Sequence, residues 1–128
     1  MAETALPFDF GPLEVPDGSR VVEVRAGLRR KRSLLGVLAR GLDFPDYFGW
    51  NWDALNDCLA TLENVDEPCV LLKHADAPGV PGSNMRRIYL EILRDAIASW
   101  SQDSQPRLRA EFPIEFRPDV EAALLSSD

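Results

Sequence analysis

The chain has 128 residues, of which 45% are hydrophobic and 27% are charged, and its formal net charge at pH 7 is −7. These values fit one globular domain, and the negative charge disfavours nucleic acid and anionic membranes as partners, since both would repel the protein. A basic protein or a cationic ligand fits better. The sequence has no run of 18 apolar residues and no secretory signal pattern, so we expect a cytoplasmic protein without a membrane span.

Residues 1–20 are interpreted as an irregular N-terminal arm, because proline and glycine interrupt every regular pattern there. Three apolar residues of this arm could still attach it to the body of the protein, namely Phe8, Phe10 and Leu13. We expect the globular domain to span residues 21–117. Residues 118–128 then form a C-terminal tail that includes a short helix.

Seven elements are expected from hydrophobic periodicity and from turn and capping residues. In chain order they are a strand at residues 21–25, a helix at 33–42, a helix at 51–63, a strand at 69–72, a helix at 84–100, a strand at 108–117 and a short helix at 119–125. Ser33 and Asn51 are candidate N-caps of the first two helices, and either Ser83 or Asn84 caps the third. Gly36 weakens the first helix by about 1 kcal/mol relative to alanine.

The alternation of strands and helices predicts the fold class. Strands that are joined through helices lie parallel in one sheet, so the order predicts an α/β domain with helices packed on a small parallel sheet. Residues 69–72 are apolar throughout, as expected of a central strand that helices cover on both sides. Pro113 interrupts the last strand and predicts a bulge or an edge.

Two aspartates lie one helical turn apart on the second expected helix. Successive residues are about 100° apart around a helix axis, so Leu55 and Leu59 mark an apolar stripe, and Asp53 and Asp57 lie opposite it. The two carboxylates repel each other by roughly 0.2 to 0.5 kcal/mol, and folding gains nothing visible from this repulsion. Taken alone, such a pair is usually a solvated face that keeps a protein soluble.

The charge around the pair favours a binding role instead. The segment from Asp43 to Glu67 has seven acids and no Lys or Arg, whereas the segment from Arg20 to Arg40 has seven bases and one acid. The seven acids are Asp43, Asp46, Asp53, Asp57, Glu63, Asp66 and Glu67. An acidic patch of this kind attracts a cationic partner and speeds its docking.

Candidate catalytic and metal-binding groups are sparse. His74 is the only histidine, and a lone histidine at a strand end is expected at the surface rather than as a general base. Cys58 lies on the buried side of its helix, where desolvation disfavours the thiolate, and a disulfide with Cys69 stays open beside the default of reduced thiols. Asp53 and Asp57 suit Ca²⁺ or Mg²⁺ but lack a third nearby ligand. We therefore expect no enzyme, no metal and no cofactor.

The segment from Tyr47 to Leu59 resembles the second-helix signature of the barstar family, the intracellular inhibitors of the secreted ribonuclease barnase. The matching positions are Tyr47, Phe48, Gly49, Asn51, Asp53, Ala54, Leu55, Asp57, Cys58 and Leu59, and Phe44-Pro45-Asp46 fits the entry turn of the family. The resemblance is close over residues 43–62 and looser over 21–116. It implies a barstar-like fold, in which a three-stranded parallel sheet packs against helices, and a bacterial protein of the immunity type.

The resemblance also implies the partner and the contact residues. The partner would be a basic ribonuclease or nuclease toxin, neither nucleic acid nor membrane, and Asp53 and Asp57 would enter its active site in place of RNA phosphates, with Asp57 as the main anchor. Together with the helix geometry, it gives the partner-binding residues Tyr47, Trp50, Asp53, Asn56, Asp57 and Asp95.

Three positions depart from the interface pattern of the family. Asn56 and Leu62 stand where the family has tryptophans, and Ser99 stands where it has a glutamate. These departures leave an alternative open, in which the chain is a barstar-fold interaction module that binds another basic protein without inhibiting a nuclease.

Overall fold

The computed structural model describes residues 6–100 and 107–125, so residues 1–5 of the expected arm and 126–128 of the expected tail lie outside the described residues, as do residues 101–106. The elements are β1 (Asp9–Phe10), β2 (Arg20–Val24), α1 (Lys31–Gly41), α2 (Trp52–Thr61), β3 (Val70–His74), α3 (Asn84–Trp100), β4 (Leu108–Phe112), a 3-10 helix (Ile114–Phe116) and α4 (Arg117–Leu125). Within these ranges, no helix combines the length and the apolar character that crossing a membrane requires.

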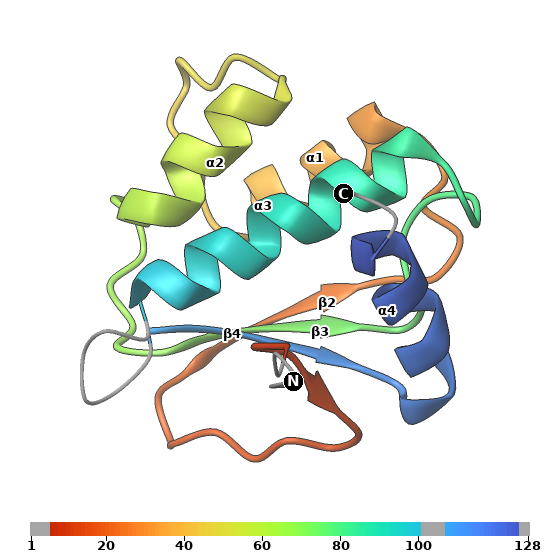
Figure 1. The fold of residues 1–128 in the computed structure, drawn as a ribbon. Coiled ribbons are helices and arrows are strands. Elements are labelled where there is room, and N and C mark those ends of the chain that lie inside the picture. The colour runs from red at the N-terminus through yellow and green to blue at the C-terminus, as the bar shows by residue number, and fades with distance from the viewer. Residues whose placement is uncertain (1–5, 101–106, 126–128) are drawn as a thin grey trace.

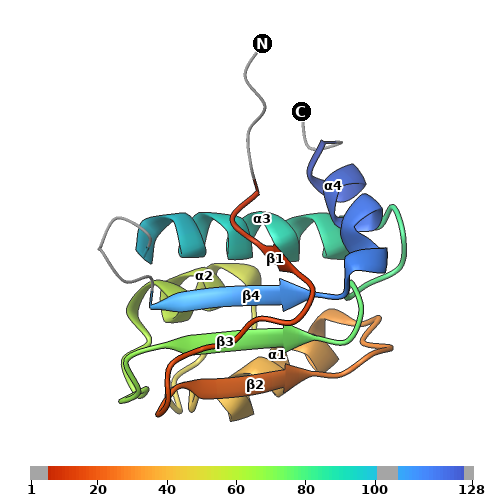
Figure 2. The same cartoon turned by 90° about the horizontal axis from the view of Figure 1, so that it is seen from below.

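The strands form one parallel sheet in the order β1-β4-β3-β2. Helices α1, α2 and α3 lie on one face of this sheet (Figure 1). The chain between β1 and β2 passes along the other face, as Figure 2 shows from below. Both the α/β class and the parallel sheet agree with the prediction from the order of the elements.

The sheet has four strands rather than the three expected. The additional strand is β1, in which Asp9 and Phe10 pair in parallel with Glu111 and Phe112 of β4. The rings of Phe8 and Phe10 also pack on Phe112, with centroid distances of 5.4 and 6.1 Å. Prolines and glycines on both sides limit β1 to two residues, which is too short to produce a periodic hydrophobic signal.

Strand β3 is central, between β2 and β4, but helices cover only one of its faces. On the other face, Leu71 is 2% exposed although no helix lies there. The chain after β1 covers this face, where the Leu13 N–H donates to Glu111 Oε1 at 3.0 Å. The expectation of helices on both sides is therefore wrong, because an irregular segment can bury an apolar strand as well.

The helix N-caps agree with the predictions for α2 and α3 but not for α1. The side-chain oxygens of Asn51 and Ser83 each accept a hydrogen bond from the amide three residues later, at 2.7 and 3.2 Å. Helix α1 begins two residues before Ser33, and its N-cap Arg30 makes no side-chain capping bond. Packing of its apolar face therefore holds α1 in place of a cap.

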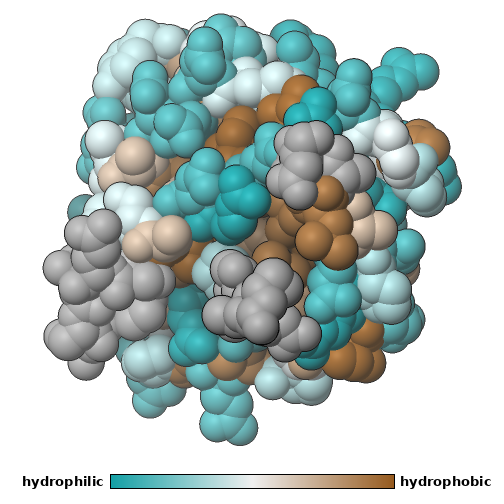
Figure 3. All heavy atoms as spheres, in the orientation of Figure 1, coloured by the Kyte–Doolittle hydropathy of each residue, from teal (hydrophilic) through white to brown (hydrophobic). Residues whose placement is uncertain are grey.

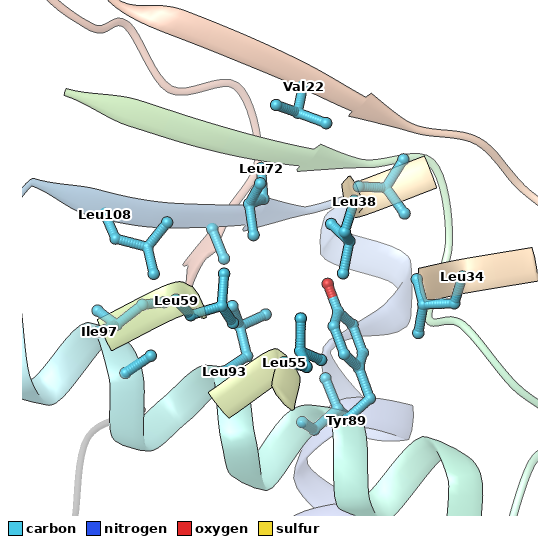
Figure 4. Close-up of a cluster of buried hydrophobic side chains, with 14 of the residues drawn as sticks. Val22, Leu34, Leu38, Leu55, Leu59, Leu72, Tyr89, Leu93, Ile97 and Leu108 are labelled. Atoms are coloured by element: carbon cyan, nitrogen blue, oxygen red, sulfur yellow. The ribbon is translucent and has the colours of Figure 1, made fainter. Parts of the chain in front are cut away.

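A single hydrophobic core joins the sheet to the helices (Figure 4). Leu55 and Leu59 of α2 are fully buried and lie against α3, while Leu72 and Leu108 come from the sheet. Each buried leucine contributes roughly 1.5 to 3 kcal/mol. The apolar side of α2 is thereby fixed on the core, and its opposite side is left to solvent.

Strand β4 ends at Phe112, and Pro113 begins the turn that leads into the 3-10 helix. Proline has no N–H for the ladder, so the strand stops instead of forming the expected bulge or edge, and β4 lies inside the sheet between β1 and β3. Helix α4 confirms the short helix that was expected from Asp119, and it begins two residues earlier.

Candidate protein-binding site

Helix α2 presents Asp53 and Asp57 on its exposed side. Asn51 caps the first turn, and Leu55 and Leu59, with no exposed surface, fix the opposite side in the core. Both aspartate side chains are exposed, as the periodicity predicts. Figure 3 views the molecule along the plane of the sheet, and on the side that it shows hydrophilic side chains surround a hydrophobic area.

Neither Asp53 nor Asp57 forms an ion pair with any residue in the described part of the chain. Other acids of the same segment do, because Arg20 lies 3.0 Å from Asp43 and 2.9 Å from Glu67. The hydrogen bond from Arg20 lowers the pKa of Glu67 below its ordinary value. Arg20 thus neutralises part of the acidic segment, whereas the carboxylates of Asp53 and Asp57 have no cationic partner among the described residues.

Tyr47 lies in the loop before α2 and is 75% exposed. Its hydroxyl donates to Glu63 Oε1 at 2.7 Å, and this hydrogen bond raises the pKa of the phenol. The bond restrains an aromatic ring that has little other contact with the protein. Tyr47 is therefore an exposed aromatic side chain whose position is fixed by a hydrogen bond.

Trp50 also precedes α2 and does not lie on it. The helix begins at Trp52, and Trp50 has a φ of 55°, in the left-handed region that costs a non-glycine residue about 1 to 2 kcal/mol. Its ring lies 5.3 Å from the ring of Phe48 and 4.7 Å from the Arg32 guanidinium. Helix geometry therefore does not set the direction of the Trp50 side chain, which is 38% exposed.

The remaining predicted positions differ in what they can offer. Asn56 is exposed on α2, and Asp95 is exposed on α3, against which α2 packs, but Arg94 already donates to the Asp95 carboxylate at 3.1 Å. Ser99 is exposed on α3. Leu62 is only 3% exposed and forms the left-handed C-cap of α2, so it offers no surface for a partner.

His74 is buried and only 2% exposed, so the expected surface position is wrong. Nδ1 lies 3.0 Å from Leu72 O and 3.1 Å from Glu111 O and must therefore carry the proton, while Nε2 accepts from the Tyr89 hydroxyl at 2.6 Å. Burial lowers the pKa of His74 to about 4. With both nitrogens engaged inside the core, His74 cannot reach a substrate.

Cys58 and Cys69 are free thiols rather than a disulfide. Cys58 is half-buried, and its desolvation raises the pKa of the thiol, which disfavours the reactive thiolate. Residues 6–100 and 107–125 contain no group of three or more side chains that could hold a metal ion. The side chains exposed on and before α2 include the two carboxylates and the Tyr47 and Trp50 rings.

Comparison with known proteins assigns the family. Residues 20–113 match the family described as Barstar (barnase inhibitor). The chain belongs to the barstar family. A Bacillus subtilis (strain 168) protein named "Putative ribonuclease inhibitor YrdF" is 36% identical over 73 residues, which make up 57% of this chain and 70% of that protein. Both names denote inhibitors and not enzymes.

Two contacts of this surface could not be predicted from the sequence. Arg20 binds Glu67 across 47 positions of the chain, and Arg32 lies over Trp50 across a helix and a loop. Opposite charge between the two segments is the one sequence signal for the first contact. It does not say which base meets which acid, because that depends on the register of β2 against β3.

Proposed function

We propose that this chain inhibits a basic ribonuclease by placing Asp53 and Asp57 in the active site as substitutes for RNA phosphates. The observation that carries the proposal is the exposed, unpaired carboxylate pair on α2 in a member of a family described as barnase inhibitors. A carboxylate, like a phosphate, accepts paired N–H bonds from arginine. Cations of the nuclease would also relieve the repulsion between the two aspartates, so both effects favour the complex.

Four residues around Asp53 and Asp57 are also exposed and could contact the same nuclease. Tyr47 and Trp50 are exposed aromatics of the segment that precedes α2, and aromatic side chains are frequent energetic centres of protein interfaces. Asn56 lies on the same helix as the aspartates, and Asp95 adds a carboxylate from α3. We propose that these four residues border the contact made by the aspartates.

Inhibition of a ribonuclease panel tests the proposal. The panel consists of barnase and the secreted ribonucleases encoded in the genome that carries this gene, and the wild type is expected to inhibit at least one of them stoichiometrically. Asp57→Ala should weaken that inhibition by about 30-fold or more, the size of an interface hot spot. Its midpoint of urea unfolding should not fall, because the side chain faces away from the core.

Asp66→Ala is the matched control, since it removes the same charge from an exposed residue after α2. It should change the inhibition constant by no more than about threefold, because it alters only long-range attraction. Equal inhibition by wild type and Asp57→Ala would contradict the mechanism. A wild type that inhibits no member of the panel would contradict the function itself.

A second candidate function is binding of another basic protein without nuclease inhibition. Asn56 and Ser99 favour it, because both are small polar side chains at positions where the family places larger contact residues. The same panel separates the two functions. A ribonuclease that stays active while saturated with the protein would favour the second candidate.

A further inference from the structure

A cluster of unpaired cations lies on α1 and the segment before it. Its members are Arg25, Arg29, Arg30, Lys31, Arg32 and Arg40, all of which are exposed. None of the six forms an ion pair with another described residue, whereas Arg20, Arg87, Arg94, Arg109 and Arg117 each pair with a carboxylate. A protein with a net charge of −7 therefore keeps one part of its surface positively charged.

Trp50 lies within this cluster, between two arginines of α1. The Arg32 guanidinium is 4.7 Å from the indole centroid. Trp50 Cζ3 and Arg40 Nη1 both approach Gly36, at 3.8 and 3.7 Å from where a Cβ would stand. Because residues 32, 36 and 40 are four apart, they share one side of α1. We call this arrangement the Arg32–Trp50–Arg40 surface.

This surface adjoins the N-terminal end of α2, because Trp50 directly precedes the N-cap Asn51 and Asp53 lies in the first turn of the helix. Lys31 Nζ lies 5.9 Å from the ring of Trp52, the first residue of α2, and Asp53 follows directly in the chain. A partner that engages Asp53 and Asp57 would therefore also meet cations on α1. The molecule presents an anionic surface and a cationic surface side by side.

We propose that the Arg32–Trp50–Arg40 surface binds carboxylates that the inhibited ribonuclease carries beside its active site. The inference rests on the proposed function and adds a second, oppositely charged contact to it. Guanidinium groups match carboxylates through paired N–H bonds, and arginine and tryptophan are frequent centres of interfaces. Trp50 has a left-handed backbone conformation at this position, with a φ of 55°.

The contacts of Trp50 favour a protein partner over RNA. A platform for a nucleotide base needs an open aromatic face, but Arg32 covers the Trp50 ring and Phe48 packs beside it at 5.3 Å. The net charge of −7 also repels an RNA backbone. Carboxylates on a basic nuclease meet neither obstacle.

Such a contact would give the inhibitor selectivity. Two carboxylates on α2 suit the active site of any basic ribonuclease, whereas the arginines suit only one with acids at the adjoining position. A nuclease without these acids would bury Arg32 and Arg40 unpaired, which is unfavourable. The cationic surface therefore selects among partners that the aspartates alone would accept.

The test compares two double variants with the same loss of charge. Arg32→Gln/Arg40→Gln alters the proposed surface, and Arg87→Gln/Arg117→Gln removes two cations from α3 and α4. Both make the protein more acidic and so strengthen its long-range attraction to a basic nuclease. Against the ribonuclease that the wild type inhibits most tightly, we expect the first variant to raise Kd about 10-fold and the second to leave it unchanged or lower it.

The outcomes distinguish this inference from the proposed function. If Asp57→Ala abolishes inhibition but Arg32→Gln/Arg40→Gln inhibits like the wild type, the inference is overturned and the function stands. If the wild type inhibits no ribonuclease of the panel, both fail. Two results would assign the surface to another occupant and overturn the inference. In the first, Arg32→Gln/Arg40→Gln still inhibits the ribonuclease but no longer binds a single-stranded RNA oligonucleotide that the wild type binds. In the second, it still inhibits but no longer self-associates in sedimentation as the wild type does.

Discussion

The side chains of His74 and Tyr89 form a polar pair inside the apolar core. The Tyr89 hydroxyl points from α3 toward the sheet (Figure 4), and the His74 ring stacks on Phe112 with centroids 4.1 Å apart. Every hydrogen-bonding group of the pair is satisfied while the imidazole is neutral. A proton on Nε2 would remove the acceptor of the Tyr89 hydroxyl and bury a charge.

This pair predicts a fall in stability at acidic pH. Because the pKa of His74 is lowered to about 4 in the folded protein from an ordinary 6.5, the unfolded chain binds the proton first as the pH falls. The contribution of neutral His74 is complete above pH 6.5 and decreases as the pH falls toward about 4, by about 3 kcal/mol in total. Urea unfolding at several pH values between 7 and 4.5 should show this decrease.

A double variant isolates the histidine from the carboxylates that titrate in the same range. His74→Asn/Tyr89→Phe keeps an N–H donor for the backbone carbonyls and removes both the titrating ring and the hydroxyl that would lose its acceptor. Its free energy of unfolding should depend less steeply on pH than that of the wild type. Parallel pH profiles for the two proteins would contradict the assignment.

Single residues were predictable from sequence where the local chain decides their environment. The capping role of Asn51 and the exposure of Asp53 and Asp57 follow from positions within one helix, and both predictions are confirmed. The burial of His74 and the backbone conformation of Trp50 were not predictable. His74 contacts Tyr89 and Trp50 contacts Arg32, and only folding brings these distant residues together. The partner-binding roles stay predictions.

At the scale of elements, α1 contains two glycines whose surroundings differ. Gly36 has a helical backbone, and a Cβ there would meet its nearest neighbours at 3.7 to 3.9 Å, which is ordinary contact. A Cβ on Gly41 would lie 2.5 Å from Val22 Cγ1. Val22 is buried on β2 and branched at Cβ, so it has few alternative rotamers. Gly41 therefore allows the close approach of α1 to β2. At Gly36 no neighbouring atom is close enough to require a glycine.

Alanine substitutions at the two glycines should change stability in opposite directions. Gly36→Ala is expected to raise the free energy of unfolding by about 0.5 to 1 kcal/mol, because alanine has the higher helix propensity and its methyl group fits. Gly41→Ala should lower it by about 1 to 3 kcal/mol through overpacking against Val22. Urea unfolding of both variants checks the signs. A destabilised Gly36→Ala variant would show that this position needs glycine for another reason.

Elements were predictable in proportion to their length and amphipathic character. Helices α2 and α3 begin near their expected caps, because each combines a capping residue with a long apolar stripe. Strand β1 was not predicted, since its two residues are too few to show a hydrophobic period. The order of the strands could not be predicted from the sequence either, because the pairing of β1 with β4 joins segments about 100 residues apart.

On the scale of the whole molecule, the N-terminal segment completes the sheet and covers part of its second face. It adds β1 to the edge of β4, places the buried Phe8 ring on Phe112, and brings the Leu13 amide to Glu111. Asp9 also pairs with Arg109 at 3.3 Å. The fold therefore depends on residues that resemble a linker in composition, and the division into arm, domain and tail stays a prediction.

Loss of this segment should destabilise the fold and expose an edge. Phe8→Ala is expected to lower the free energy of unfolding by about 3 to 5 kcal/mol, because it leaves a cavity beside Phe112. The control Ile114→Ala should change it by no more than about 0.5 kcal/mol, since Ile114 is 58% exposed.

Deletion of residues 1–10 removes β1 as well and leaves the backbone groups of β4 unpaired, so the shortened protein should associate with increasing concentration. Urea unfolding and sedimentation measure the two effects. A shortened chain that is as stable as the wild type and monomeric would mean that β1 does not protect the edge of β4. Phe8 is buried against Phe112, whereas Asp53 and Asp57 are exposed on α2, so Phe8→Ala should still inhibit the ribonuclease at temperatures where it remains folded.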